Sequence, residues 1–452
     1  MYPNLDIKRA DKSDFEIENE ANCYPENPET GIDLFLEKLA EETEKDYDVL
    51  NQTDAMFGEL YSWYLRNPEY RSRVQKLVQS AFEGKPKDII SQSVAKALYG
   101  EISPYSATRL ERFAACAFAH FLQYGMKLTE RVEYEFKAMD MGNVMHEALE
   151  SFAEEVRKRG LKWTELTEQE RNQIADQCLD NIVADYGNTV LKSSARNEYM
   201  IERTRRILRR TVWALQKQLE QGEFQPEGFE VTFGGGRIDR VDIMEDQNKV
   251  YVKVIDYKTG NTSFDLVYLY HGLQLQLMIY LDGALRVEQK KYPDKEIIPA
   301  GVFYYNIKDP MIQEKIDADV EAVSAGLMKE LKMNGLVQAD AELVRRIDNS
   351  LGSIPVAFNK DGSFRKNSSV ADKTQFTVLG RYVRTKIEKI RSSILEGDAQ
   401  VSPYELGKKN ACTYCPYITV CGFDRKLSGY DFRRLKSFSD EELWKAFDRE
   451  AE

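Results

Sequence analysis

Four cysteines are spaced so that they could hold a metal centre. Cys412, Cys415 and Cys421 form a C-x2-C-x5-C run near the end of the sequence, and Cys116 lies roughly 300 residues upstream. Thiolates are the ligands of structural zinc and of iron-sulfur clusters. The spacing alone leaves both centres open, and His120 is close enough to Cys116 to serve zinc. Either centre would join two distant segments of one domain.

A second set of polar residues lies in a stretch that alternates like a β-strand. Asp239 stands in Gly236-Arg-Ile-Asp-Arg-Val, and Asp256-Tyr-Lys258 begins seventeen residues later. Side chains alternate along a strand, so Asp256 and Lys258 share one face, and a hairpin partner places Asp239 beside them. Paired carboxylates hold Mg²⁺ or Mn²⁺, whose waters can attack a phosphodiester. Lys258 could orient that water or offset charge at phosphorus.

The setting of this motif separates it from an ordinary surface pair, which is what a lone D-x-K usually is. Val252, Val254 and Ile255 precede it as an apolar run, and Gly260 follows it. His146 adds a candidate ligand. A histidine on an apolar helix face is more often a core residue, but ahead of such a sheet it becomes a candidate third metal ligand.

Composition describes an ordinary soluble chain. The 452 residues are 42% apolar and 31% charged, enough for two or three domains with a sizeable core. No apolar run approaches the roughly 20 residues of a membrane helix, and the polar start is unlike a targeting peptide, so we expect a cytoplasmic protein without membrane contact. Six cysteines are too few for a disulfide scaffold, which leaves Cys23 and Cys178 as free thiols.

The net charge of −12 means that a nucleic acid would need a local basic surface. The densest basic run is Arg203, Arg205, Arg206, Arg209 and Arg210. Such a run is usually a solvated helix face, but in a nuclease it is a candidate phosphate track. Arg240 and Lys253, near the strands, are further candidates. No P-loop motif is present.

The expected elements make an α/β protein. Helices are predicted over 106–124, from near 142, and over 168–186, 198–221, 273–290 and 377–395, and strands over 227–233, 237–243, 250–257 and 300–305. Gly234-Gly235-Gly236 is predicted as a hairpin entry, and residues 309–373 give no clear pattern. We expect a helical segment over 1–100, a metal-stapled domain over 101–425 and a tail over 426–452.

The ordered set His146, Asp239, Asp256-x-Lys258 and Gln276-x-x-x-Tyr280 resembles the PD-(D/E)xK nucleases of the RecB type. That resemblance implies a restriction-endonuclease-like core, a mixed sheet flanked by helices. It also implies that His146, Asp239 and Asp256 hold Mg²⁺ or Mn²⁺, and that Gln276 and Tyr280 join the catalytic set. The cysteine framework narrows the resemblance to the iron-sulfur branch, which implies a 4Fe-4S cluster with a structural role.

The stretch 106–128 with Asp140-Met-Gly-Asn-Val-Met-His146 most resembles the AddB family, the B subunits of bacterial ATP-dependent helicase-nucleases. The likeness covers about 98–435, and Ala117 stands where the family commonly has proline. AddB proteins carry a long helicase-like region ahead of the nuclease, of which at most the last segment is present here. We therefore expect either a C-terminal fragment or a shortened homologue.

The AddB resemblance implies a metal-dependent DNA exonuclease for double-strand break repair and recombination. It would cut the strand of 5′ polarity in single-stranded ends that an AddA-like helicase-nuclease partner unwinds. Three alternatives stay open from the residues. They are a cleavage-dead DNA-binding or scaffolding subunit, a stand-alone iron-sulfur nuclease of the CRISPR-adaptation type, and a zinc-stapled interaction domain.

Overall fold

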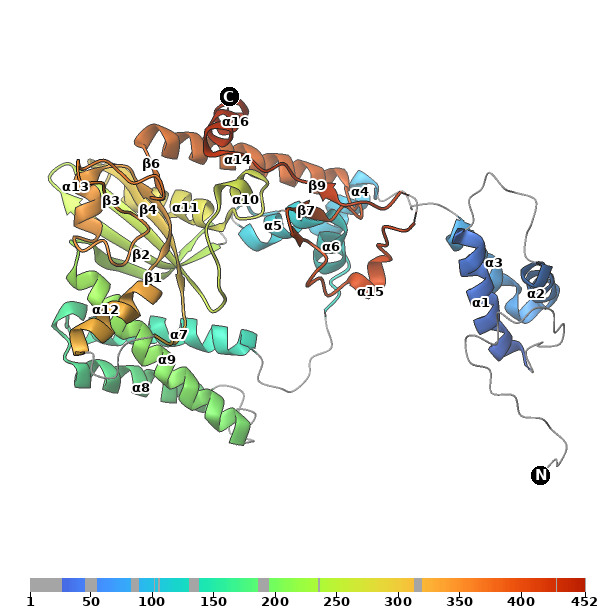
Figure 1. Cartoon of the computed structure of the whole chain (residues 1–452), viewed down its shortest axis with the longest axis horizontal. Coiled ribbons are helices and arrows are strands. Elements are labelled where there is room, and N and C mark those ends of the chain that lie inside the picture. Colours follow the sequence, from blue (N-terminus) through green and yellow to red (C-terminus); the bar gives the residue numbers. More distant parts are fainter. Residues whose placement is uncertain are drawn as a thin grey trace. The chain divides into compact units, whose positions relative to one another are not determined.

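The chain folds into two compact units in a computed structural model, one comprising Met1–Lys87 with Asp424–Asp431, the other Asp88–Phe423 with Phe432–Glu452 (Figure 1). The described residues are 27–44, 55–82, 89–100, 102–104, 106–129, 138–185, 195–234, 236–312, 319–427 and 429–451. Cys23 and Gly235 lie outside these ranges, and so does Tyr186, the predicted end of a helix.

The described residues of the first unit form the helices α1 (Pro28–Glu44), α2 (Ala55–Arg66) and α3 (Pro68–Phe82). Apolar residues recur at helical spacing on each of them, and they close over a small core of their own. Phe35 is fully buried there, with its ring stacked 5.4 Å from that of Phe57. The unit therefore has the packing of a separate helical body.

A six-stranded mixed sheet forms the centre of the second unit, in the order β1-β2-β3-β4-β5-β6. Its strands are β1 (Gln225–Phe233), β2 (Gly236–Asp246), β3 (Lys249–Lys258), β4 (Glu296–Asn306), β5 (Asn334–Gln338) and β6 (Val370–Ala371). The β1–β2, β2–β3 and β4–β5 pairs are antiparallel, whereas the β3–β4 and β5–β6 pairs are parallel. A parallel pair needs a crossover, and the segment between β3 and β4 supplies it with α10 (Leu266–Tyr270) and α11 (Gln276–Lys291).

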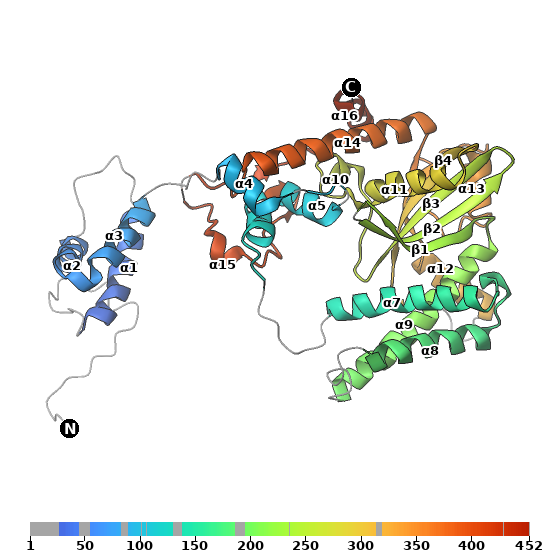
Figure 2. The ribbon, with the colours of Figure 1, turned by 180° about the vertical axis from the view of Figure 1, so that it is seen from behind.

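Helices cover both faces of the sheet, as Figures 1 and 2 show from opposite sides. On one side lie α7 (Ala138–Lys158), α8 (Glu168–Asp185) and α9 (Ala195–Glu220), and on the other α11 and α14 (Lys373–Glu396). Strand alternation divides the core accordingly. In β3, Ile255 and Tyr257 join the α7–α9 layer, while Val252 and Val254 join the α11–α14 layer.

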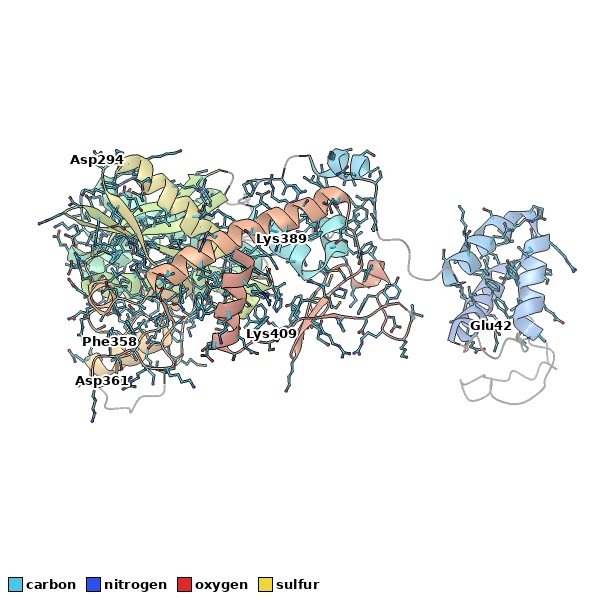
Figure 3. The ribbon with its side chains drawn as sticks, turned by 90° about the horizontal axis from the view of Figure 1, so that it is seen from above. Glu42, Asp294, Phe358, Asp361, Lys389 and Lys409 are labelled. Atoms are coloured by element: carbon cyan, nitrogen blue, oxygen red, sulfur yellow. The ribbon has the colours of Figure 1, made fainter. Side chains whose placement is uncertain are left out.

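A helical and cysteine-bearing part adjoins the sheet within the second unit. Its helices are α4 (Gln92–Tyr99), α5 (Ala107–Ala115) and α6 (Ala117–His120), followed by a π-helical turn over Phe121–Gly125. Its C-terminal elements are β7 (Tyr404–Leu406), β8 (Lys409–Asn410), α15 (Ile418–Cys421), β9 (Arg433–Arg434) and α16 (Asp440–Ala451). Figure 3 shows α14, which carries the labelled Lys389, running along this unit.

Several predicted boundaries change. The helix expected over 106–124 is interrupted at Cys116, whose φ of −164° and ψ of 118° are extended. The residues expected as a tail after 425 include α16, whose Phe447 is fully buried against α14. The unclear stretch 309–373 contains α12 (Val320–Glu330) and α13 (Ala341–Ile347) besides two strands. Among the described helices, none is long and apolar enough to cross a membrane.

Candidate active site

The two predicted carboxylates lie side by side where β2 and β3 part. Arg240 is paired with Ile255 across the two strands, and Asp239 and Asp256 are the next residues along each. At this point the backbone amide of Tyr257 donates to Asp239 Oδ2 at 2.7 Å, so the Asp239 side chain takes the place of a backbone carbonyl of the neighbouring strand. Asp239 is 8% exposed and Asp256 1%. The hairpin therefore brings both acids to one buried edge.

Lys258 connects this edge to α11. Its Nζ lies 2.6 Å from Asp256 Oδ2 and donates to Gln276 Oε1 at 2.8 Å. The Gln276 amide in turn donates to the Tyr280 hydroxyl at 2.9 Å. Residues one turn apart on a helix share a face, which explains the Gln276-x-x-x-Tyr280 spacing. The chain from Asp256 to Tyr280 thus fixes the position of the ammonium group.

His146 reaches the same edge from α7. Its Nδ1 lies 3.4 Å from Asp239 Oδ2, and its ring packs edge-on against Tyr257. One turn earlier, a Cβ on Gly142 would lie only 3.3 Å from Thr259 Oγ1, just beyond β3. The glycine therefore lets α7 approach the strand end closely enough for the histidine of Gly-x-x-x-His to reach the carboxylates.

Glu230 is a fourth candidate metal ligand, which the sequence analysis missed. Its Oε1 lies 3.8 Å from His146 Nδ1, and Arg237 Nε lies 2.5 Å from its Oε2. With His146 and Asp239 it forms the one group of three potential metal ligands within 4.8 Å among the described residues. The Glu230 side chain is only 6% exposed. A carboxylate among the aromatic and β-branched residues of Phe229–Phe233 was the available signal.

An open cavity of about 860 Å³ gives access to this site. Its lining includes the acidic residues Glu147, Glu150, Glu230 and Asp239, together with Arg237. Clustered acids repel a phosphodiester, so a cation bound among them would favour its entry by offsetting their charge. The donor set of one imidazole and several carboxylates fits a hard divalent cation.

Electrostatics at the site point the same way. Burial raises the pKa of Asp256 to about 7, with a further rise from Asp239 and an opposing effect from Lys258. Burial lowers the pKa of His146, but hydrogen bonds to Asp239 and Glu230 outweigh it and raise the pKa to about 10. A divalent cation bound among these acids would lower the free-energy cost of ionising all of them.

Comparison with known proteins places this geometry in a family. A family model described as the PD-(D/E)XK nuclease superfamily matches residues 104–422, which include every residue of the site. The chain belongs to this superfamily. The predicted nuclease core, a mixed sheet flanked by helices, is confirmed.

Relatives make the resemblance more specific. The PD-(D/E)XK chain is 39% identical over its whole length to a protein of Lachnoclostridium phytofermentans, and 33% identical over 90% of its length to one of Thermoanaerobacter sp. (strain X514). Both are named as the B subunit of an ATP-dependent helicase/deoxyribonuclease, so the predicted likeness to such B subunits is confirmed. The chain spans 40% and 37% of the length of these two relatives.

One residue predicted to contact DNA lies inside the PD-(D/E)XK core. Arg240 is 2% exposed and forms two contacts with Asp242, of 2.6 and 2.9 Å. Lys253 Nζ lies 2.9 Å from the same Asp242 carboxylate. The guanidinium of Arg240 packs over the rings of Trp163 and Phe229. Strand alternation turns Arg240 away from Asp239 and into the α7–α9 layer. The DNA-binding expectation for Arg240 is therefore wrong.

The remaining predicted DNA contacts line a separate groove. Arg203, Arg206 and Arg210 border a cavity of about 730 Å³ between α8, α9 and α12. Arg206 Nε lies 2.5 Å from Asp309, and Arg210 packs over Trp213. The other two arginines of the run are paired with carboxylates of α8. None of the described residues lining this groove also lines the cavity beside Asp239 and His146.

The four predicted cluster cysteines are brought together. Burial raises the pKa of Cys412 to about 12, and the neighbouring thiols of Cys116, Cys415 and Cys421 raise it further. Cys116 and Cys415 also share a small apolar cluster with Tyr417. His120 is fully buried, with the guanidinium of Arg109 donating to its Nε2, so that nitrogen is already engaged.

Proposed function

We propose that the chain carries the nuclease module of a helicase-nuclease B subunit and hydrolyses DNA with Mg²⁺ or Mn²⁺. The observation that supports this most is the convergence of Asp239, Asp256 and Lys258 with His146 at one buried strand edge. A dead relative would have no need to keep this arrangement complete. The relatives' printed name, which includes deoxyribonuclease, favours DNA as the substrate.

The metal ligands in this proposal are His146, Asp239 and Asp256, with Glu230 as a further carboxylate. A bound divalent cation would offset phosphate charge and lower the pKa of water. The protein's own residues do the positioning. The His146 imidazole interacts with both Asp239 and Glu230, and the ligand atoms of the three residues lie within 4.8 Å of one another. The cavity leaves that point open to a phosphodiester from the solvent side.

Lys258 is the proposed electrophilic residue of the chemistry. Its ammonium is fixed between Asp256 and Gln276, so it meets the phosphate without reorganising. It offsets the negative charge that develops on the phosphoryl oxygens as the bond to the leaving oxygen breaks. Tyr280 acts through Gln276, because its hydroxyl accepts a hydrogen bond from the Gln276 side-chain amide and so fixes that side chain.

We further propose a 4Fe-4S cluster on Cys116, Cys412, Cys415 and Cys421, with a structural role. The neighbouring thiols of Cys116, Cys415 and Cys421 raise the pKa of Cys412, which supports one shared centre for the four cysteines. The resemblance to the iron-sulfur branch favours a cluster over zinc.

The whole-protein role rests on the relatives. We propose that the module acts in double-strand break repair in the bacterial cytoplasm. There it would cut the strand of 5′ polarity in single-stranded ends supplied by an AddA-like partner. The relatives' name, as the B subunit of an ATP-dependent helicase/deoxyribonuclease, supports a partner and a helicase. Single strands labelled at either end, in parallel assays, test the polarity directly.

Substitution of Asp256 tests the proposed chemistry. Asp256→Ala removes a metal ligand from a preformed edge, so cleavage of single-stranded DNA should fall on the order of 10³-fold, while DNA binding is kept. Lys258→Ala should be comparably inactive but still bind Mn²⁺ in calorimetry. A rate within about tenfold of the parent for Asp256→Ala would exclude this site as the catalytic centre.

A further inference from the structure

Helix α11 begins without a cap from its own sequence. Leu275 stands at the N-cap position and its side chain makes no capping hydrogen bond. The first N–H groups of a helix have no partner within it, and they need one when they lie away from water. Here the partner comes from α5: Glu111 Oε1 accepts from the amides of Leu275 at 2.6 Å and Gln276 at 2.9 Å.

The capped residue is the one that holds the catalytic lysine. Gln276 is the first residue of α11, and its side-chain oxygen accepts from Lys258 Nζ at 2.8 Å. A carboxylate at a helix N-terminus is favoured by the helix dipole as well as by the two hydrogen bonds. Displacement of the first turn of α11 would therefore move the amide oxygen that fixes the ammonium.

The surroundings of Glu111 fit a fixed rather than a solvated carboxylate. It lies partly buried, within electrostatic reach of Lys258 and Asp256. Burial raises its pKa to about 7, against the opposing effect of the two α11 amides. Glu111 is not among the residues that line the cavity, but its hydrogen-bond partner Gln276 is. Apart from its electrostatic interaction with Lys258 and Asp256, Glu111 reaches the site through the first turn of α11.

The other end of α5 is held by the cysteine-bearing part. Four residues after Glu111 the helix ends at Ala115, and Cys116 follows in extended conformation. The Arg433 guanidinium donates to the Ala114 carbonyl, and the Phe118 amide donates to Gln400 O at 2.9 Å. Helix α5 is thus a short rod between the four cysteines and the first turn of α11.

We propose that Glu111 is a positioning residue of the catalytic centre. It fixes the first turn of α11, through which Gln276 holds Lys258, and it transmits the placement of α5 set at the cysteine end. The expected effect of Glu111 on kcat rests on the proposed nuclease function. The cap itself is a property of the protein without DNA or metal.

Three variants separate capping from other roles. Glu111→Ala removes the acceptor, so kcat on single-stranded DNA should fall on the order of 10-fold to 100-fold, with KM within about twofold and iron content unchanged. Glu111→Gln keeps an acceptor oxygen and should recover kcat to within about threefold of the parent. Glu288→Gln changes a buried carboxylate at the far end of α11, paired with Lys291, and should leave kcat unchanged.

A double-mutant cycle tests the route through Gln276. If Glu111 acts only by holding that residue, Glu111→Ala with Gln276→Ala should have a kcat within about twofold of Gln276→Ala alone. Additive losses would overturn the proposal. If Glu111→Ala does not fold, Glu111→Asp, which withdraws the carboxylate by one methylene, replaces it and should still lower kcat about fivefold or more.

Hydrogen exchange gives a readout that needs no activity. In Glu111→Ala, amides of a peptide spanning 273–280 should exchange about tenfold faster or more, whereas Glu288→Gln leaves them unchanged. Unchanged exchange in Glu111→Ala overturns the cap, whatever happens to kcat. Faster exchange in Glu111→Ala, in a protein whose Asp256→Ala variant still cleaves DNA, keeps the cap and rejects the proposed function instead.

Discussion

Two buried carboxylates on neighbouring strands make the proposed catalytic edge electrostatically costly. Asp256 is almost fully buried, Asp239 lies beside it, and one ammonium, Lys258, is in contact. In a poorly hydrated site, ionising Asp256 beside Asp239 is costly even with Lys258 and His146 facing it, which favours protonation of Asp256 or binding of a cation. The ionised carboxylates are thus unfavourable in the absence of a bound cation, so the residues proposed for catalysis are expected to reduce the stability of the protein.

This strain has a pH signature. Burial and Asp239 raise the pKa of Asp256 from 3.8 to about 7, so folding favours its protonated form. Because the pKa of Asp256 is higher in the folded protein than in the unfolded chain, its protonated form contributes to the free energy of unfolding. That contribution is complete below about pH 4 and is lost as the pH rises through 7. Asp256→Asn cannot ionise and escapes this loss. Without metal, it should be more stable than the parent at pH 8 by about 1 kcal/mol or more.

Urea unfolding in a chelating buffer at pH 5 and pH 8 measures this difference. The stability advantage of Asp256→Asn should grow between the two pH values, because the parent alone pays the ionisation cost. His146 and Lys258 face Asp256 as well, and both remain in the variant. An advantage that is equal at both pH values would show that Asp256 does not titrate in this range.

Residue alternation explains what the sequence could predict at this scale. The two-residue spacing of Asp256 and Lys258 was enough to place them on one face, and both lie there. The same rule would have excluded Arg240, since it neighbours Asp239 and must point to the opposite layer. Glu230 was harder to foresee, because it has a positive φ of 49° and β1 is irregular near Gly228.

At the scale of elements, the interruption between α5 and α6 matters most. The sequence there reads as one amphipathic helix, since apolar residues continue at helical spacing through Cys116 and no Gly or Pro marks a break. Ala117 stands where a proline would have signalled it. The break frees Cys116 to face the C-terminal cysteines, a tertiary requirement that local propensity does not encode.

The cysteine elements give an element-scale prediction. If Cys116 shares one cluster with Cys412, Cys415 and Cys421, then Cys116→Ser should lose iron and its absorption near 400 nm. Binding energy of a metal centre is folding energy when the ligands are not preassembled. Residues 404–423, which hold β7, β8 and α15, should therefore become sensitive to proteolysis despite their distance in sequence.

Cys178→Ser is the matched control for this experiment. Cys178 is also a buried free thiol, but it lies in the α7–α9 layer. Its variant should keep the iron and the digestion pattern of the parent. Stoichiometric zinc in the parent, or full iron in Cys116→Ser, would contradict the shared iron-sulfur cluster and redirect the search to another ligand.

At the scale of the whole molecule, organisation was less predictable than the site. The long helices, the three-stranded start of the sheet and the order of the motifs follow from local patterns. The packing of α16 against α14 does not follow from a local pattern. The amphipathic sequence of α16 indicates that one face is buried, but not which element covers that face. Glu111 is a similar case: nothing local distinguishes it from other helix carboxylates until α11 is packed beside it.

DNA affinity is also a whole-molecule property, since a chain with a net charge of −12 must bind phosphate locally. We expect Arg203, Arg206 and Arg210, along the groove of α8, α9 and α12, to contribute to it. Arg206 is partly offset by Asp309, which limits its share. Replacement of all three by glutamine should weaken binding of single-stranded DNA and flatten its salt dependence.

The slope of log K against log salt measures that contribution. Each lost phosphate contact removes about 0.7 from the slope for a single strand, so the triple variant should lose about 1 to 2. Arg381→Gln, Arg384→Gln and Lys389→Gln on α14 make the same change in net charge at exposed positions elsewhere. An equal loss in both triples would mean that net charge acts alone. A loss confined to the first places the DNA strand in the arginine groove.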